Sequence, residues 1–195
     1  MATRTAASVF GNAVSRVFHP GVSVLAGLFC VGWVTGGWYW SIVSVLAGVV
    51  PPGMLAFILK ACGVIENIDV PSRGQRVALL SVLIAMEIGA ALFYLLMQAP
   101  RNLIVAQLAM TAGLAALAVG TMWTKVSAHA GLLAIMVAAL VVVGGWSFAP
   151  LFILVPVIAV GRVTIDAHTW VQVMYASIVP PLATLLVGWG LLAIG

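Results

Sequence analysis

Long apolar runs separated by short polar segments dominate the sequence. A membrane-spanning helix needs about 20 apolar residues, and several of these runs reach or approach that length. The predicted spans are, in order, Gly21 to Trp38, Ser41 to Ile65, Val77 to Gln98, Asn102 to Trp123, Ala130 to Trp146, Pro150 to Val160, and Thr169 to the C-terminus. The pattern predicts an all-α polytopic membrane protein with about six to seven transmembrane helices; six applies if a short run is re-entrant.

Helix-breaking residues refine these boundaries. The first run ends in the helix-weak sequence TGGWYW, and the second carries Pro51-Pro52 near its middle, where a kink or break is expected. Asn102 is a plausible N-cap for its helix. A second proline pair, Pro180-Pro181, lies inside the last run.

The chain divides into a short N-terminal segment and one helical domain. Residues 1–20 are predicted to form an amphipathic surface segment, with its apolar side formed by Val9, Val14, Val17 and Phe18. Residues 21–195 predict a single transmembrane helical domain. Neither an internal repeat nor a linker interrupts it.

Three polar segments interrupt the apolar runs, at 66–76, 125–129 and 161–172. Two spans separate each segment from the next, so an even number of crossings places all three on the same membrane face. They hold most of the ionisable residues of the chain. These are Glu66, Asp69, Arg73, Arg76, Lys125, His129, Arg162, Asp166 and His168.

Composition supports a membrane protein that handles anions. Only 6% of the residues are charged and 64% are hydrophobic, whereas a soluble domain carries roughly 25% charged residues. The formal net charge of +4 suits an anionic substrate or anionic lipid. Cys30 and Cys62 lie in apolar runs and are expected to be free thiols.

The polar cluster has the chemistry of a phosphate site. Guanidinium groups match phosphate oxygens with paired hydrogen bonds, while a lysine acts as a point charge. The four carboxylates of the chain are not grouped as a hard-metal cage requires, so no metal and no cofactor is expected. Phosphoryl transfer would then use a side-chain nucleophile. Imidazole can act in this way if one nitrogen is held by a partner while the other attacks.

At this point the residues resemble a known family. Arg162, five residues and His168 match the spacing of the third motif of the type 2 phosphatidic acid phosphatase superfamily, S-R-x5-H-x3-D. V-S-A-H at 126–129 resembles its second motif, P-S-G-H. The segment at 69–76 resembles a variant of its first motif, K-x6-R-P, with Arg76 as the match. The resemblance covers roughly residues 66–176 and implies a helical bundle like that of the family.

The resemblance also implies roles for individual residues. His168 would attack phosphorus and form a phosphohistidine, and His129 would protonate the leaving oxygen and later activate water. Arg162 would hold the phosphate. Further phosphate-binding residues would be Arg76, Arg73, Lys125 and Ser127. Lys125 and His129 would share one side of a helix at i and i+4.

Several positions depart from the family pattern. Asp69 replaces the lysine of the first motif, so Lys125 or Arg73 would supply that charge. Val126 and Ala128 replace a proline and a glycine, and Gly161 replaces a serine. Gln172 stands where the family has the aspartate that orients the nucleophilic histidine. Its amide oxygen can accept the imidazole N–H, and Asp166 is an alternative.

The sequence therefore favours a multi-pass membrane phosphatase acting on a lipid phosphomonoester or pyrophosphate, with a glycerolipid or polyprenyl tail. Its partners would be the lipid substrate and membrane lipids, with no nucleic acid; the oligomeric state stays open. We expect a plasma-membrane location with the site facing the cytoplasm, because Lys and Arg are enriched at that face. Two alternatives remain: a catalytically degenerate anionic-lipid-binding protein, and a transporter that uses the mid-span Glu87.

Overall fold

The computed structural model describes residues 6–63 and 73–194, and all regular structure in these ranges is helical. The elements are α1 (Ala6–Val17), α2 (Pro20–Ala61), α3 (Arg73–Leu96), α4 (Arg101–Trp123), α5 (Ala128–Gly144), the 3-10 helix η1 (Trp146–Ile153), α6 (Leu154–Thr164) and α7 (Trp170–Ala193). Five helical segments are long and apolar enough to cross a membrane, with η1 and α6 counted together, and α5 is a shorter apolar helix. The predicted all-α class is confirmed.

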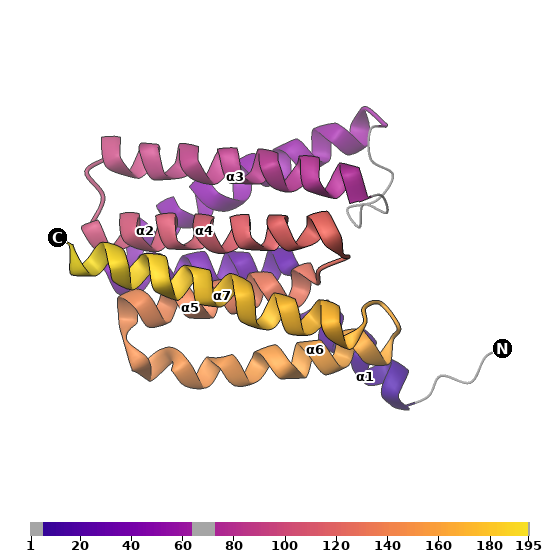
Figure 1. Cartoon of the computed structure of the whole chain (residues 1–195). Helices are drawn as coiled ribbons and strands as arrows, with labels where there is room; N and C mark the ends of the chain where they lie inside the picture. Colours follow the sequence, from indigo (N-terminus) through magenta and orange to yellow (C-terminus); the bar gives the residue numbers. More distant parts are fainter. Residues whose placement is uncertain (1–5, 64–72, 195) are drawn as a thin grey trace.

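Helix α2 folds back on itself at a pair of glycines. Gly36 and Gly37 leave the helical region, and Gly37 adopts a φ of 73°, which glycine tolerates without the steric cost of a side chain. The second arm then runs back along the first, so that a Cβ on Gly48 would lie 2.5 Å from Leu28. The first predicted span therefore ends at the TGGWYW sequence, and the two arms traverse the bundle in opposite directions (Figure 1).

Of the kink or break predicted at Pro51-Pro52, a break is not found, because both prolines lie inside α2; a kink stays a prediction. Two adjacent prolines remove only two backbone donors, and a helix surrounded by lipid keeps its remaining hydrogen bonds intact. The predicted N-cap at Asn102 is also wrong. Pro100 occupies that position, and Asn102 lies in the first turn of α4.

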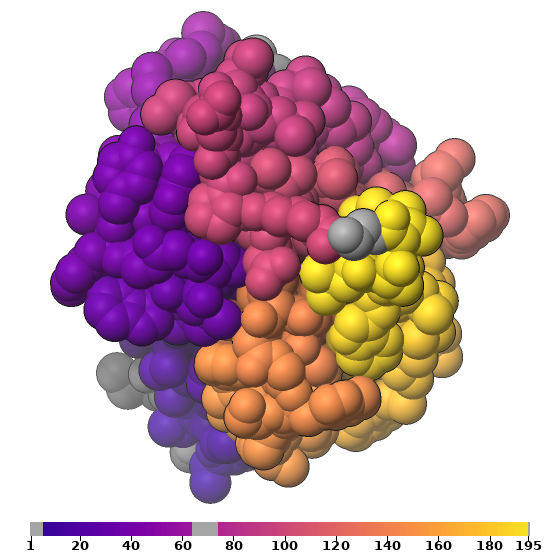
Figure 2. All heavy atoms as spheres, turned by 90° about the vertical axis from the view of Figure 1, so that its left-hand side faces the viewer, coloured from indigo at the N-terminus to yellow at the C-terminus, as the bar shows by residue number. Residues whose placement is uncertain are grey.

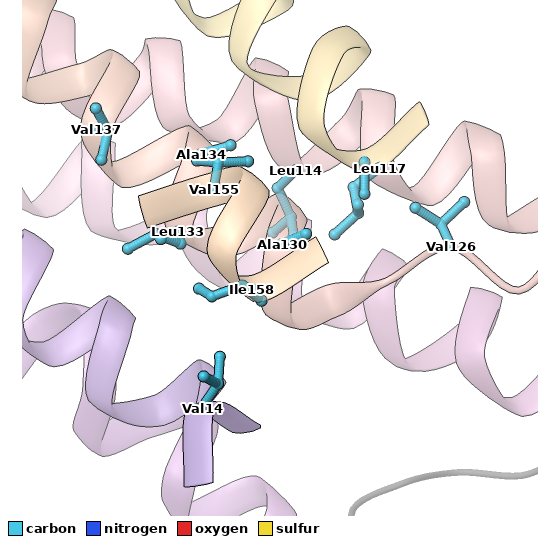
Figure 3. Close-up of a cluster of buried hydrophobic side chains, with 11 residues drawn as sticks. Val14, Leu114, Leu117, Val126, Ala130, Leu133, Ala134, Val137, Val155 and Ile158 are labelled. Carbon is cyan, nitrogen blue, oxygen red and sulfur yellow. The ribbon is translucent and has the colours of Figure 1, made fainter. Parts of the chain in front are cut away.

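Helix α5 forms the centre of the bundle. It is buried along most of its length and packs against α2, α4, α6, α7 and η1. Small residues such as Ala130, Ala134 and Ala138 are fully buried and let the neighbouring helices approach closely. Figure 3 shows one of the two core clusters, in which α5 side chains meet Leu117 of α4 and Ile158 of α6.

The two ends of the bundle differ in chemistry. At one end, shown on the right in Figure 1, α2, α4 and α6 terminate and α3, α5 and α7 begin, and α1 lies beside them. We call this the site end. Figure 2 shows the opposite end, where α2, the α3–α4 turn, η1 and the last turns of α7 pack around one another. There Arg101 donates a hydrogen bond of 2.9 Å to the Leu191 carbonyl.

Candidate functional site

His168 is held at the site end by the segments before α5 and at the start of α7. Its Nδ1 lies 3.1 Å from the backbone oxygen of Lys125 and 3.1 Å from Oε1 of Gln172. The same Oε1 accepts from the backbone N–H of Thr169 at 3.2 Å, as part of a capping box at the start of α7. Nε2 of Gln172 donates to Thr124 at 3.3 Å. Both polar atoms of this amide are thus used in positioning His168.

These contacts determine the tautomer of His168. The Lys125 carbonyl and the Gln172 amide oxygen can only accept hydrogen bonds, so Nδ1 must carry the hydrogen. In the neutral ring Nε2 then has a free lone pair. His168 is therefore arranged as a potential nucleophile or base through Nε2.

The surroundings of His168 favour its neutral form. Partial burial is the main cause that lowers the pKa of His168, and the positive charges of Arg162 and Lys125 lower it further. The hydrogen bonds to Gln172 and to the Lys125 carbonyl act in the opposite direction but do not reverse the shift. Nε2 consequently keeps its lone pair to a lower pH than in an ordinary histidine.

Arg162 lies in the last turn of α6 and is supported by α1. Its Nη1 donates to Oγ of Ser15 at 3.3 Å, and Ser15 in turn donates to the Gly11 carbonyl at 2.7 Å. The pKa of His168 is thus lowered by two charged residues, Arg162 and Lys125, whose segments meet at the site end.

Helix α1 can reach Arg162 only because Gly11 has no side chain. A Cβ on Gly11 would lie 2.6 Å from the Gly161 carbonyl oxygen and 2.5 Å from the Ile165 side chain. The buried side of α1 is formed by Gly11 and Val14, while Val9 and Val17, predicted for the apolar side, are exposed. Gly11 and Ser15, two small residues four positions apart, thus lie where α1 docks against α6.

The start of α5 adds a second group of polar residues. Ser127 is the N-cap of α5 and is fully buried, and its Oγ has no hydrogen-bond partner among the residues that the structure describes. His129 follows in the first turn and is also buried. The His19 ring lies edge-on to the His129 ring, with 5.9 Å between their centroids. His19 is exposed, and its Nδ1 accepts from the Gly21 N–H.

The structure gives less detail on the other predicted site residues. Lys125 precedes α5, which begins at Ala128, so the predicted i, i+4 relation between Lys125 and His129 within one helix is wrong. The short TKVS segment is not helical, and Ser127 stands at the N-cap position of α5 with an extended backbone. Arg76 lies in the first turn of α3 at the site end. Glu66 and Asp69 lie outside the described residues, as does the side chain of Arg73.

Sequence reasoning missed Ser15, His19 and Thr124. Ser15 could have been found from the Gly11-x3-Ser15 pattern, which is typical of close helix contacts. His19 stands before Pro20, a signal for a helix start, but nothing local indicates that its ring meets His129. Thr124 is adjacent to a recognised segment. Asp166, which was considered for orienting His168, is exposed, and Gln172 and the Lys125 carbonyl hold Nδ1 instead.

Comparisons with protein-family models, curated proteins and solved structures find no match to this chain. The fold and composition define its class: an all-helical chain with the long apolar helices of an integral membrane protein.

Proposed function

We propose that this protein is a membrane-embedded phosphatase that removes phosphate from a lipid phosphomonoester or pyrophosphate without a metal. The observation that carries the proposal is the arrangement of His168. Two acceptors hold its Nδ1–H, which leaves Nε2 as a nucleophile, and Arg162 and Lys125 supply positive charge around it. The resemblance to the type 2 phosphatidic acid phosphatases points to the same residues.

The proposed reaction has two steps. Nε2 of His168 attacks phosphorus, the bond to the lipid oxygen breaks, and His129 gives its proton to that oxygen. Water then gives a proton to His129 and attacks the phosphohistidine, which releases phosphate and restores Nε2. Arg162, Lys125 and Arg76 would stabilise the equatorial oxygens, and Ser127, a buried hydroxyl without a described partner, would donate a hydrogen bond.

A groove beside the site would hold the lipid tail. It lies between α6 and α7, encloses about 220 Å³ and is almost entirely apolar. Its walls include Val160, which is two residues before Arg162, and Trp170, which is two residues after His168. A lipid whose phosphate meets the basic residues could therefore leave one chain in this groove. Burial of each methylene contributes about 0.8 kcal/mol to such binding.

A phosphate-release screen tests the reaction. Purified protein in EDTA should release phosphate from at least one glycerolipid or polyprenyl phosphate, and vanadate should inhibit it because vanadate mimics five-coordinate phosphorus. His168→Ala should lose at least about 10⁴-fold in rate, whereas Asn102→Ala, at the opposite end, should match the wild type. Activity that vanishes in EDTA and returns with Mg²⁺ would contradict the proposed class. Lipid binding without turnover would favour the non-catalytic alternative.

We also propose seven membrane crossings, with both arms of α2, then α3, α4, α5, η1–α6 and α7 as the spans, in a plasma-membrane protein. The N-terminus and the site would then share one side, and Lys and Arg, including Arg16 and Lys60, gather there, which favours the cytoplasm. Single cysteines at Ser8 and Gly74, in a variant lacking both native cysteines, should resist an impermeant thiol reagent in intact cells. Labelling of both would reverse the orientation.

A further inference from the structure

A second polar cluster lies inside the bundle, between the two ends. Glu87 is located within the apolar α3 and Gln107 within the apolar α4. Nε2 of Gln107 donates to the Glu87 carboxylate and also to the Glu87 backbone carbonyl, the latter at 3.2 Å. Gln107 is completely buried. A carboxylate within a spanning helix is costly, and by default it marks a functional site.

Three buried side-chain oxygen atoms in and beside this pair have fewer hydrogen bonds than they could make. They are Oε1 of Gln107, the Tyr94 hydroxyl and Oγ of Ser44, all in side chains that are fully buried. Within the described part of the chain Oε1 of Gln107 has no partner, and the hydroxyl groups of Tyr94 and Ser44 interact only with each other. Tyr94 lies near Ser44 and within electrostatic range of Glu87, so α2, α3 and α4 each contribute to one cluster. Buried polar atoms are normally satisfied, and orphans of this kind call for a ligand.

The donor set restricts what that ligand can be. Every available atom is an oxygen: a carboxylate, an amide oxygen and two hydroxyls. Hard cations prefer such ligands. The described residues contain no group of three His, Cys, Asp or Glu side chains, which a transition metal would favour.

The charge of the cluster further restricts the identity of the ligand. Glu87 is the only charged side chain on α2, α3 and α4 away from their ends, and Tyr94 is the only other titratable group in the cluster. When Glu87 is ionised, its single negative charge is neutralised by a monovalent cation, whereas a divalent cation would leave a net charge in the apolar interior.

We propose that Glu87, Gln107, Tyr94 and Ser44 form an intramembrane binding site for a monovalent alkali cation, with Na⁺ as the first candidate. Gln107 fixes one carboxylate oxygen through Nε2 and directs the other toward the cation. Tyr94 and Ser44 complete the site from the α2 side. The cluster stands about 25 Å from the candidate phosphate site, by the rise of α4 from Gln107 to Thr124. It is independent of the phosphatase proposal.

Carbodiimide protection tests this site. Dicyclohexylcarbodiimide enters the membrane and modifies carboxyl groups that bind no cation, and mass spectrometry measures the modification of Glu87. Purified full-length protein in phosphatidylcholine nanodiscs is compared in NaCl and in N-methylglucamine chloride, at constant pH and ionic strength. Only empty protein reacts, so labelling should fall about tenfold when Na⁺ reaches about ten times its Kd. Direct binding of radiolabelled Na⁺ should saturate at one ion per chain.

Two serines one turn apart on α2 provide a matched pair of variants. Both are fully buried, but Ser41 already donates to the Gly37 carbonyl at 3.1 Å, whereas Ser44 interacts among the described residues only with Tyr94 of the cluster. Ser44→Ala and Tyr94→Phe should raise the Na⁺ concentration needed for protection, and Ser41→Ala should not. The proposal is overturned if no alkali cation protects wild-type Glu87 and radiolabelled Na⁺ does not bind. It is equally overturned if only a change of pH alters labelling, since the site then binds a proton alone.

Discussion

Two glutamines show how differently this bundle treats its polar groups. Gln172, at the site end, uses its oxygen to hold His168 and the Thr169 N–H, and its nitrogen to reach Thr124. Gln107, inside the bundle, donates to Glu87 but leaves its oxygen buried without a described partner. The first amide completes a network that fixes one tautomer of a histidine. The second belongs to a cluster that is incomplete without a ligand.

The two glutamines therefore have different proposed roles: Gln172 positions His168, and Gln107 belongs to a site that binds a ligand. A network in which every polar atom is hydrogen-bonded makes the side chain at its centre rigid. Buried polar atoms without partners destabilise the fold until a ligand binds to them. Each candidate site should therefore respond to different substitutions. Variants around His168 should change turnover, and variants around Glu87 should change cation affinity.

After the loss expected for His168→Ala, the largest effect is expected at Gln172. Gln172→Leu removes the acceptor that helps to keep the hydrogen on Nδ1, and loss of a tautomer-fixing partner has cost about 10⁴-fold in a hydrolase triad. Because the Lys125 carbonyl remains as a second acceptor, we expect a loss of about 10²- to 10⁴-fold in kcat. Gln172→Asp should keep or raise the rate. A harmless Gln172→Leu would show that another group orients His168.

A smaller effect is expected where α1 docks. Gly11→Val places side-chain atoms against the Gly161 carbonyl, so α1 must move away and Arg162 loses Ser15. Misplacement of a binding group by about 1 Å can cost up to about 10²-fold; we expect a ten- to hundredfold loss of kcat/KM. Gly190→Ala, which adds a methyl group in open space, serves as the control. Equal rates in both variants would exclude a role for α1.

The smallest effect concerns pH. If neutral His168 attacks phosphorus as proposed, the rate falls as pH drops through its pKa, and the lowered pKa should preserve activity below the ordinary histidine range near 6.5. Lys125→Met removes one of the charges that lower this pKa. The acidic limb of the kcat profile should move upward by less than about one pH unit, because Lys125 is exposed and screened. A downward shift would contradict the assignment.

The sequence allowed much of this architecture to be predicted. Lengths of apolar runs gave most of the helices, the TGGWYW sequence marked the reversal of α2, and counting spans placed the polar segments at one end. Those signals are local. The docking of α1, the His19–His129 contact and the Tyr94–Ser44 approach depend on which helices become neighbours, and a single sequence contains no direct record of that. Lys125 was misplaced because the start of α5 depends on capping, where boundaries are least certain.

The phosphorylated intermediate provides the most direct test of nucleophilic attack by His168. Purified protein is mixed with a lipid phosphate carrying radiolabelled phosphorus and quenched in alkali, where phosphohistidine is stable. We expect label on the peptide containing His168, no label in His168→Ala, and slower loss of the label in variants that slow the second step. Rapid phosphate release with no labelled protein, and a wild-type rate in His168→Ala, would contradict nucleophilic attack by this residue.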